Sequence, residues 1–123
     1  MSHKVISWNR LESLIDRVSI SLFGITNPTF IPITNDGIIP AILLQCKTHG
    51  AYSPYYKNSV ENPILVAGAH TDKVVKIQQR YEVKYSREIP TLSLIVYEDS
   101  KTEPTYHARR SLIAYTWPWE QTL

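Results

Sequence analysis

The segment with the clearest chemical potential is Gly-Ala-His-Thr-Asp-Lys-Val, residues 68–74. It follows an apolar run and precedes a stretch that can open a helix, where free backbone N–H groups favour an anion. Thr71 can donate a hydrogen bond to such an anion, and Lys73 can offer a positive charge. His70 has the side chain suited to acid or base catalysis near neutral pH. The alternatives are a solvated loop histidine and an ordinary capping turn at Asp72 that binds nothing.

A second turn, Thr34-Asn35-Asp36-Gly37, has the same place between a predicted strand and a predicted helix. Gly37 supplies the backbone freedom that a tight turn needs. In open α/β sheets, ligands bind beyond the carboxyl ends of the strands, where such turns gather. We therefore expect both turns at one edge of a sheet, although Asp and Gly are also common in turns without a ligand.

Three helices are predicted to position these turns. The first begins at Trp8, where apolar residues recur at spacings of three and four; Ser7 or Asn9 can cap it, and Gly24 can end it. The second covers residues 38–46, with its proline in the first turn. The third begins at residue 72 or 73 and continues to about residue 81.

Strands alternate with these helices. Apolar runs predict them at residues 29–33, 51–56, 63–67, 91–97 and 112–115. Strands separated by helices pair in parallel through right-handed crossovers. The predicted class is therefore α/β, with a mostly parallel sheet of about four to five strands flanked by helices, in one domain over residues 1–123.

Composition sets limits on the function. The chain has 123 residues, of which 43% are hydrophobic, which suits one domain with one core. A formal charge of +2 is too small to indicate nucleic acid, which is not expected as a partner. The single Cys46 excludes an internal disulfide and a cysteine-rich zinc site, and we expect it to be a small buried hydrophobe. No apolar run approaches the roughly 18 residues that span a bilayer, so a cytoplasmic protein is expected.

Four segments, taken in order, resemble a known family. They are Ile-Ser-Trp-Asn-Arg-Leu-Glu-Ser-Leu-Ile-Asp-Arg-Val at residues 6–18, Thr-Asn-Asp-Gly-Ile-Ile-Pro-Ala at 34–41, Glu-Pro-Thr-Tyr-His-Ala at 103–108, and Trp-Pro-Trp-Glu at 117–120. This order is similar to the small type I phosphoribosyltransferases, closest to the xanthine and hypoxanthine (purine) group. The resemblance implies the type I fold, phosphoribosyl pyrophosphate (PRPP) as ribose donor, Mg²⁺ at the PRPP site and a homodimer.

The family's PRPP loop is preserved only in part. The family places two acidic residues and then Asp-Thr-Gly-Lys-Thr after an apolar strand. Here the acidic pair falls on Gly68 and Ala69, the loop aspartate on Asp72, and the rest on residues 73–76. Gly and Ala offer no side-chain oxygen to ribose or Mg²⁺. The resemblance thus implies a weak phosphate site at residues 70–73 without the magnesium–ribose clamp.

The other two family sites show similar changes. In the pyrophosphate loop, Asn35 replaces an arginine, and Asp36 replaces a glycine and brings a negative charge that would oppose a pyrophosphate. In the base pocket, Glu98 falls where the family has a lysine. The stacking aromatic is replaced by alanine, which leaves Tyr115 and Trp117 as the aromatic residues expected at the base-pocket position.

Three functions remain open on these residues. The first is a phosphoribosyltransferase-like protein with a degenerate PRPP site, which binds a nucleotide, another phosphate-containing ligand or a protein partner with little or no transferase activity. The second is an active, divergent purine phosphoribosyltransferase, which alone would need Mg²⁺. The third is a non-enzymatic interaction protein, phage-encoded and using the fold as a scaffold, for which 8 Tyr and 3 Trp offer interface material.

Overall fold

A parallel sheet forms the centre of the computed structural model, which describes residues 3–120. Its strands lie in the order β3-β2-β4-β5-β6, and every neighbouring pair is parallel. Their bounds are β2 (Pro28–Pro32), β3 (Ala51–Tyr52), β4 (Asn62–Ala69), β5 (Thr91–Tyr97) and β6 (Tyr106–Ser111). A separate pair joins β1 (His3–Val5) to β7 (Ala114–Thr116). The predicted α/β class and parallel sheet are confirmed.

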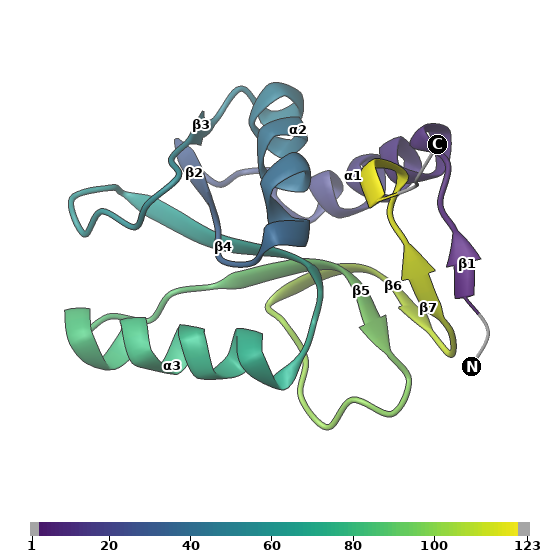
Figure 1. The fold of residues 1–123 in the computed structure, drawn as a ribbon. Coiled ribbons are helices and arrows are strands. Elements are labelled where there is room, and N and C mark those ends of the chain that lie inside the picture. The colour runs from purple at the N-terminus through teal and green to yellow at the C-terminus, as the bar shows by residue number, and fades with distance from the viewer. Residues whose placement is uncertain (1–2, 121–123) are drawn as a thin grey trace.

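The helices cover both faces of this sheet. Helices α1 (Trp8–Ile20) and α2 (Ile38–Thr48) lie over one face, and α3 (Asp72–Tyr85) lies over the other (Figure 1). Two short 3₁₀ helices, η1 (Asn35–Gly37) and η2 (Pro118–Glu120), follow β2 and β7. In the described part of the chain, no helix has the length and apolar character needed to cross a membrane.

Helix α1 shows how local sequence sets an element. Its apolar residues recur on one face, and Leu11, Leu14, Ile15 and Val18 are buried. The side chain of Ser7 accepts a hydrogen bond from the N–H of Arg10 at 3.1 Å, so Ser7 is the cap rather than Asn9. The helix ends at Ile20, before the turns that lead to Gly24.

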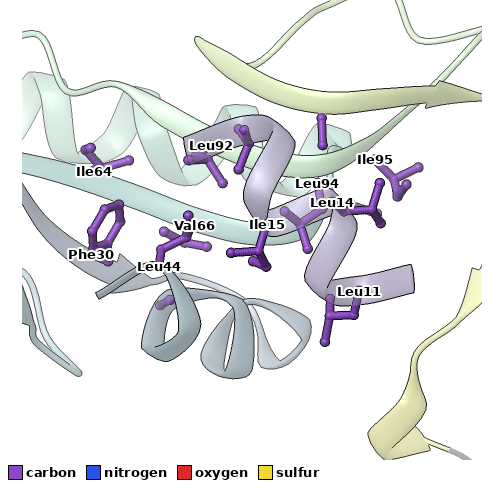
Figure 2. Packing of buried hydrophobic residues seen from close by; sticks show 14 of the residues in the cluster. Leu11, Leu14, Ile15, Phe30, Leu44, Ile64, Val66, Leu92, Leu94 and Ile95 are labelled. Carbon is purple, nitrogen blue, oxygen red and sulfur yellow. The ribbon is translucent and has the colours of Figure 1, made fainter. Parts of the chain in front are cut away.

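The main core lies between α1, α2 and the sheet. Figure 2 shows side chains from α1 and α2 meeting those of β2, β4 and β5. Its fully buried large residues include Leu11, Phe30, Leu44, Ile64 and Leu92. Burying one such side chain contributes about 1.5–3 kcal/mol. This packing fixes the position of the β2 and β4 carboxyl ends, where both predicted turns lie.

A smaller cluster lies on the α3 side of the sheet. Ile31, Leu65 and Ile89 are buried there, and Tyr56 and Tyr81 pack against them. The Tyr56 ring stacks on Tyr81 at 5.3 Å between centroids. These tyrosines therefore cover the second core, which accounts for part of the aromatic content without an interface.

Some local predictions are wrong. The last strand of the sheet is β6, whereas residues 112–115 contain only the start of β7, and Leu112 is 87% exposed. Cys46 is exposed rather than buried. Trp8, the first of the recurring apolar residues of the predicted helix, is 55% exposed. Strand β6 was not predicted because its sequence is polar. It is an edge strand, paired on one side only, and such a strand needs no regular apolar alternation.

Candidate ligand-binding edge of the sheet

The two predicted turns meet where the order of strands reverses. From β2 the chain passes through α2 to the outer strand β3, and from β4 it passes through α3 to β5 on the other side. The loops after β2 and β4 therefore diverge at the carboxyl edge of the sheet, which is the usual place for a ligand in such folds.

Asp36 joins these two loops. Its Oδ1 accepts a hydrogen bond from the N–H of Gly68 at 2.9 Å, and its Oδ2 accepts one from the N–H of Ala69 at 3.2 Å. The hydroxyl of Thr34 donates a further hydrogen bond to Oδ1. The carboxylate is half-buried and points inward. A charged acceptor on two backbone N–H groups makes strong hydrogen bonds, so Asp36 fixes the η1 turn to the end of β4.

Two glycines allow this close approach. A Cβ at Gly68 would lie 2.8 Å from the Cγ of Asp36 and 2.8 Å from the Cζ2 of Trp117. At Gly37 a Cβ would lie 2.9 Å from the carbonyl carbon of Val66. Gly37 has φ −91°, an ordinary helical conformation, so the expectation that it supplies unusual backbone freedom is wrong. Its role is to let η1 pack directly on β4.

His70 is not the solvated loop residue of the alternative interpretation. Its side chain is only 2% exposed, and its Nε2 lies 2.9 Å from the hydroxyl oxygen of Thr102. Burial lowers the pKa of His70 below its ordinary value, Asp72 opposes this shift, and His107 adds to it. The Nδ1 atom is buried without a partner among the described residues. Burial thus favours the neutral form of the ring.

The other residues of the phosphate-loop prediction are exposed. Thr71 precedes α3 in extended conformation, and its hydroxyl does not cap the helix. Asp72 lies in the first turn of α3. Lys73 lines a cavity of about 400 Å³ together with Thr34 and Asn35 of the first loop. The fold thus brings part of both predicted anion loops to one cavity, while Asp36 and His70 point elsewhere.

A second cavity, of about 660 Å³, lies at the carboxyl end of β5. It is lined by Tyr97, Glu98, Asp99, Leu112 and Ala114. Burial raises the pKa of the Tyr97 phenol, and the negative charges of Asp36 and Glu120 raise it further. The lining of this cavity combines the apolar side chains of Leu112 and Ala114 with the acidic residues Glu98 and Asp99.

The predicted base-pocket residues separate in the structure. Glu98 lines the second cavity. Tyr115 alternates with Ala114 along β7; it packs against the core and does not line that cavity. Trp117 is buried, stacked on Trp119 at 5.4 Å, and forms a wall against Gly68.

The residues at this edge do not fit the Mg²⁺ site that the family resemblance implies. Magnesium needs oxygen ligands, and the two positions of the family's acidic pair are Gly68 and Ala69, which present N–H groups to Asp36. Among residues 3–120, no three His, Cys, Asp or Glu side chains gather as a metal site.

Sequence reasoning missed the inward position of Asp36 and the contribution of Tyr97. Nothing local in the sequence indicated the inward position of Asp36, because its contact with Gly68 joins residues 32 positions apart. Tyr97 ends the clearest predicted strand, at the edge where ligands bind, and that position was an available signal.

Comparison with known proteins supports the fold. No protein-family model and no curated protein sequence matches the chain. A purine phosphoribosyltransferase from Pyrococcus horikoshii matches in structure with a TM-score of 0.80 and 17% identity, over 100% of this chain and 97% of that one. The xanthine-guanine-hypoxanthine phosphoribosyltransferase of Helicobacter pylori matches with a TM-score of 0.79 and 11% identity, over 97% of this chain and 93% of that one.

A third solved structure is a hypothetical protein from Neisseria gonorrhoeae with bound ppGpp. It matches with a TM-score of 0.70 and 10% identity, over 98% of this chain and 90% of that one. The parallel five-stranded sheet, the helices on both its faces and these whole-length matches show that the chain has the type I phosphoribosyltransferase fold.

Proposed function

We propose that this chain is a phosphoribosyltransferase-like protein of the purine type, which binds a phosphate-bearing purine nucleotide and has little or no transferase activity. Asp36 is the observation that carries the proposal. Its carboxylate accepts hydrogen bonds from Gly68 and Ala69, at the two positions where the family resemblance places ribose-binding acids. By the family resemblance, an efficient transferase needs side-chain oxygens there for ribose or Mg²⁺, and positive charge in the pyrophosphate loop to stabilise the leaving pyrophosphate.

The phosphate of the ligand belongs at the N-terminus of α3. Lys73 offers positive charge in the cavity that it lines with Thr34 and Asn35. The hydroxyl of Thr71 makes no capping hydrogen bond to α3, and the N-terminus of this helix favours an anion. The base belongs in the cavity at the end of β5, whose apolar wall includes Leu112 and Ala114. Among the structural neighbours, one is a protein solved with ppGpp bound, which supports including that nucleotide among the ligands tested.

Binding of a protein partner is the second candidate. Ile20 is 75% exposed and Phe23 is 94% exposed, and they lie close together at the end of α1. Exposed aromatic residues of this kind anchor interfaces. A homodimer, phage origin and cytoplasmic location remain predictions.

Calorimetric titration of the purified protein with GMP, ppGpp and PRPP, each with and without Mg²⁺, tests the proposal. We expect a nucleotide to bind without a requirement for Mg²⁺, and PRPP to bind weakly or not at all. Mg²⁺-dependent binding of PRPP would favour the active, divergent transferase. Binding of none of the three would leave the partner-binding candidate.

A further inference from the structure

The contacts of Asp36 define an anion site inside the protein. Two successive backbone N–H groups, those of Gly68 and Ala69, point at one carboxylate, at 2.9 and 3.2 Å. Strand β2 ends at Pro32, opposite Val66, so on that side β4 continues past the end of its neighbour. Buried N–H groups of β4 that lie beyond the end of β2 have no partner in that strand, so they need an acceptor from elsewhere. Asp36 supplies it.

The surroundings are shaped to hold an anionic group at this point. Gly68 has no side chain, and a Cβ there would lie 2.8 Å from the Cγ of Asp36. Trp117 closes the opposite side at the same distance from that Cβ. The hydroxyl of Thr34 adds a third donor. Removing the carboxylate would leave two N–H groups, a hydroxyl and the volume of a small anionic group.

The charge of Asp36 also extends over the edge of the sheet. It contributes to the raised pKa of Tyr97, whose side chain lines the β5 cavity. A second anion placed near the N–H groups of Gly68 and Ala69 would be repelled by this carboxylate and would find its donors already used.

We propose that the N–H groups of Gly68 and Ala69 form an anion site that the chain fills with its own Asp36 carboxylate. Asp36 is thus an internal competitor that excludes phosphate and pyrophosphate from this part of the edge. The inference rests in part on the proposed function and deepens it: the phosphate of a ligand is directed to Lys73, and a pyrophosphate group is rejected.

Calorimetric titration with inorganic pyrophosphate tests the inference in the wild-type protein and in Asp36→Ala. We expect Asp36→Ala to bind pyrophosphate at least about tenfold more tightly than the wild type. Glu88→Ala is the matched control, because it removes the same charge from an exposed residue lining a separate cavity at the end of α3 and the loop that follows it. Equal affinity in wild type and Asp36→Ala, or an equal gain in Glu88→Ala, would overturn the inference.

A second measurement does not depend on the folding of that variant. In ¹⁵N-labelled wild-type protein, added pyrophosphate should leave the amide resonances of Gly68 and Ala69 in place. In Asp36→Ser, which keeps a small oxygen acceptor, the same addition should move both resonances. Saturable movement of the two resonances in the wild type would overturn the inference. The outcome is separable from the nucleotide titrations, since a protein that binds no nucleotide can still gain pyrophosphate affinity when Asp36 is removed.

Discussion

Trp117 packs directly against the backbone of Gly68: a Cβ added to the glycine would lie 2.8 Å from the Cζ2 atom of the indole. The same Cβ would lie equally close to the Cγ of Asp36. The end of β4 is therefore held between Trp117, which connects β7 to η2, and the first loop.

Gly68→Ala should lower the free energy of unfolding by about 1–3 kcal/mol, because either Trp117 or Asp36 must move. Urea unfolding followed by tryptophan fluorescence measures the change. The matched experiment repeats the substitution in an Asp36→Ala background. There the contact with the Asp36 Cγ is gone, while those with Trp117 and with the backbone carbonyl oxygen of residue 36, at 2.9 Å, remain, so the cost should be smaller. An equal cost in both backgrounds would mean that the Asp36 contact does not constrain the glycine.

His70 should make the protein less stable in mild acid. Above about pH 6.5, its ordinary pKa, the ring is neutral in both the folded and the unfolded chain. Because burial lowers the folded pKa, the unfolded chain takes up a proton first as the pH falls below 6.5, and the stability decreases until the folded pKa is reached. Urea midpoints at pH 5 and pH 7 measure this loss. In His70→Gln the part of the loss due to His70 should disappear; an unchanged pH dependence would contradict the assignment.

Substitutions in the tyrosine cluster test whether these side chains cover the second core or are free to form an interface. Tyr56 contacts Tyr81 at 5.3 Å and Tyr85 at 4.5 Å between ring centroids. We expect Tyr56→Ala to cost about 2 kcal/mol of stability, from lost packing and two aromatic pairs. The neighbouring Tyr55 is 76% exposed, and Tyr55→Ala should cost less than about 0.5 kcal/mol. Similar costs for the two variants would show that Tyr56 is not part of the second core.

Lys73 should contribute to nucleotide binding through its charge. Lys73→Ala is expected to weaken GMP binding about three- to tenfold in calorimetry at low salt, and less at high salt. Lys76, exposed one turn further along α3, is the matched control, and Lys76→Ala should bind GMP as the wild type does. Equal losses in both variants would point to a diffuse charge effect rather than to the cavity beside Thr34.

Much of the fold could be predicted from periodicity. The start of α1, with Ser7 as one of two candidate caps, and the buried strand at Thr91–Tyr97 follow from local residues, because burial and capping leave regular sequence signals. Strand β6 could not be predicted in the same way. It is an edge strand with the sequence Tyr-His-Ala-Arg-Arg-Ser, and its pairing with β5 is set by the tertiary fold.

The meeting of the two turns at one edge of the sheet could be predicted, but the contacts of their side chains could not. Lys73 and Thr34 share a cavity, in agreement with two turns at one edge. The burial of His70 beneath the loop at Thr102 and the inward position of Asp36 depend on residues about 30 positions away. Long-range hydrogen bonds of this kind have no local signal in one sequence.

By the function proposed above, the protein binds a nucleotide but does not transfer ribose 5-phosphate. The most direct test is pyrophosphate release from PRPP and Mg²⁺ in the presence of guanine, hypoxanthine or xanthine. We predict no release above the rate without protein, because Asp36 occupies the N–H groups of Gly68 and Ala69 and no acidic pair is present to hold Mg²⁺ there. Sustained release that depends on both the protein and a purine base would contradict the account.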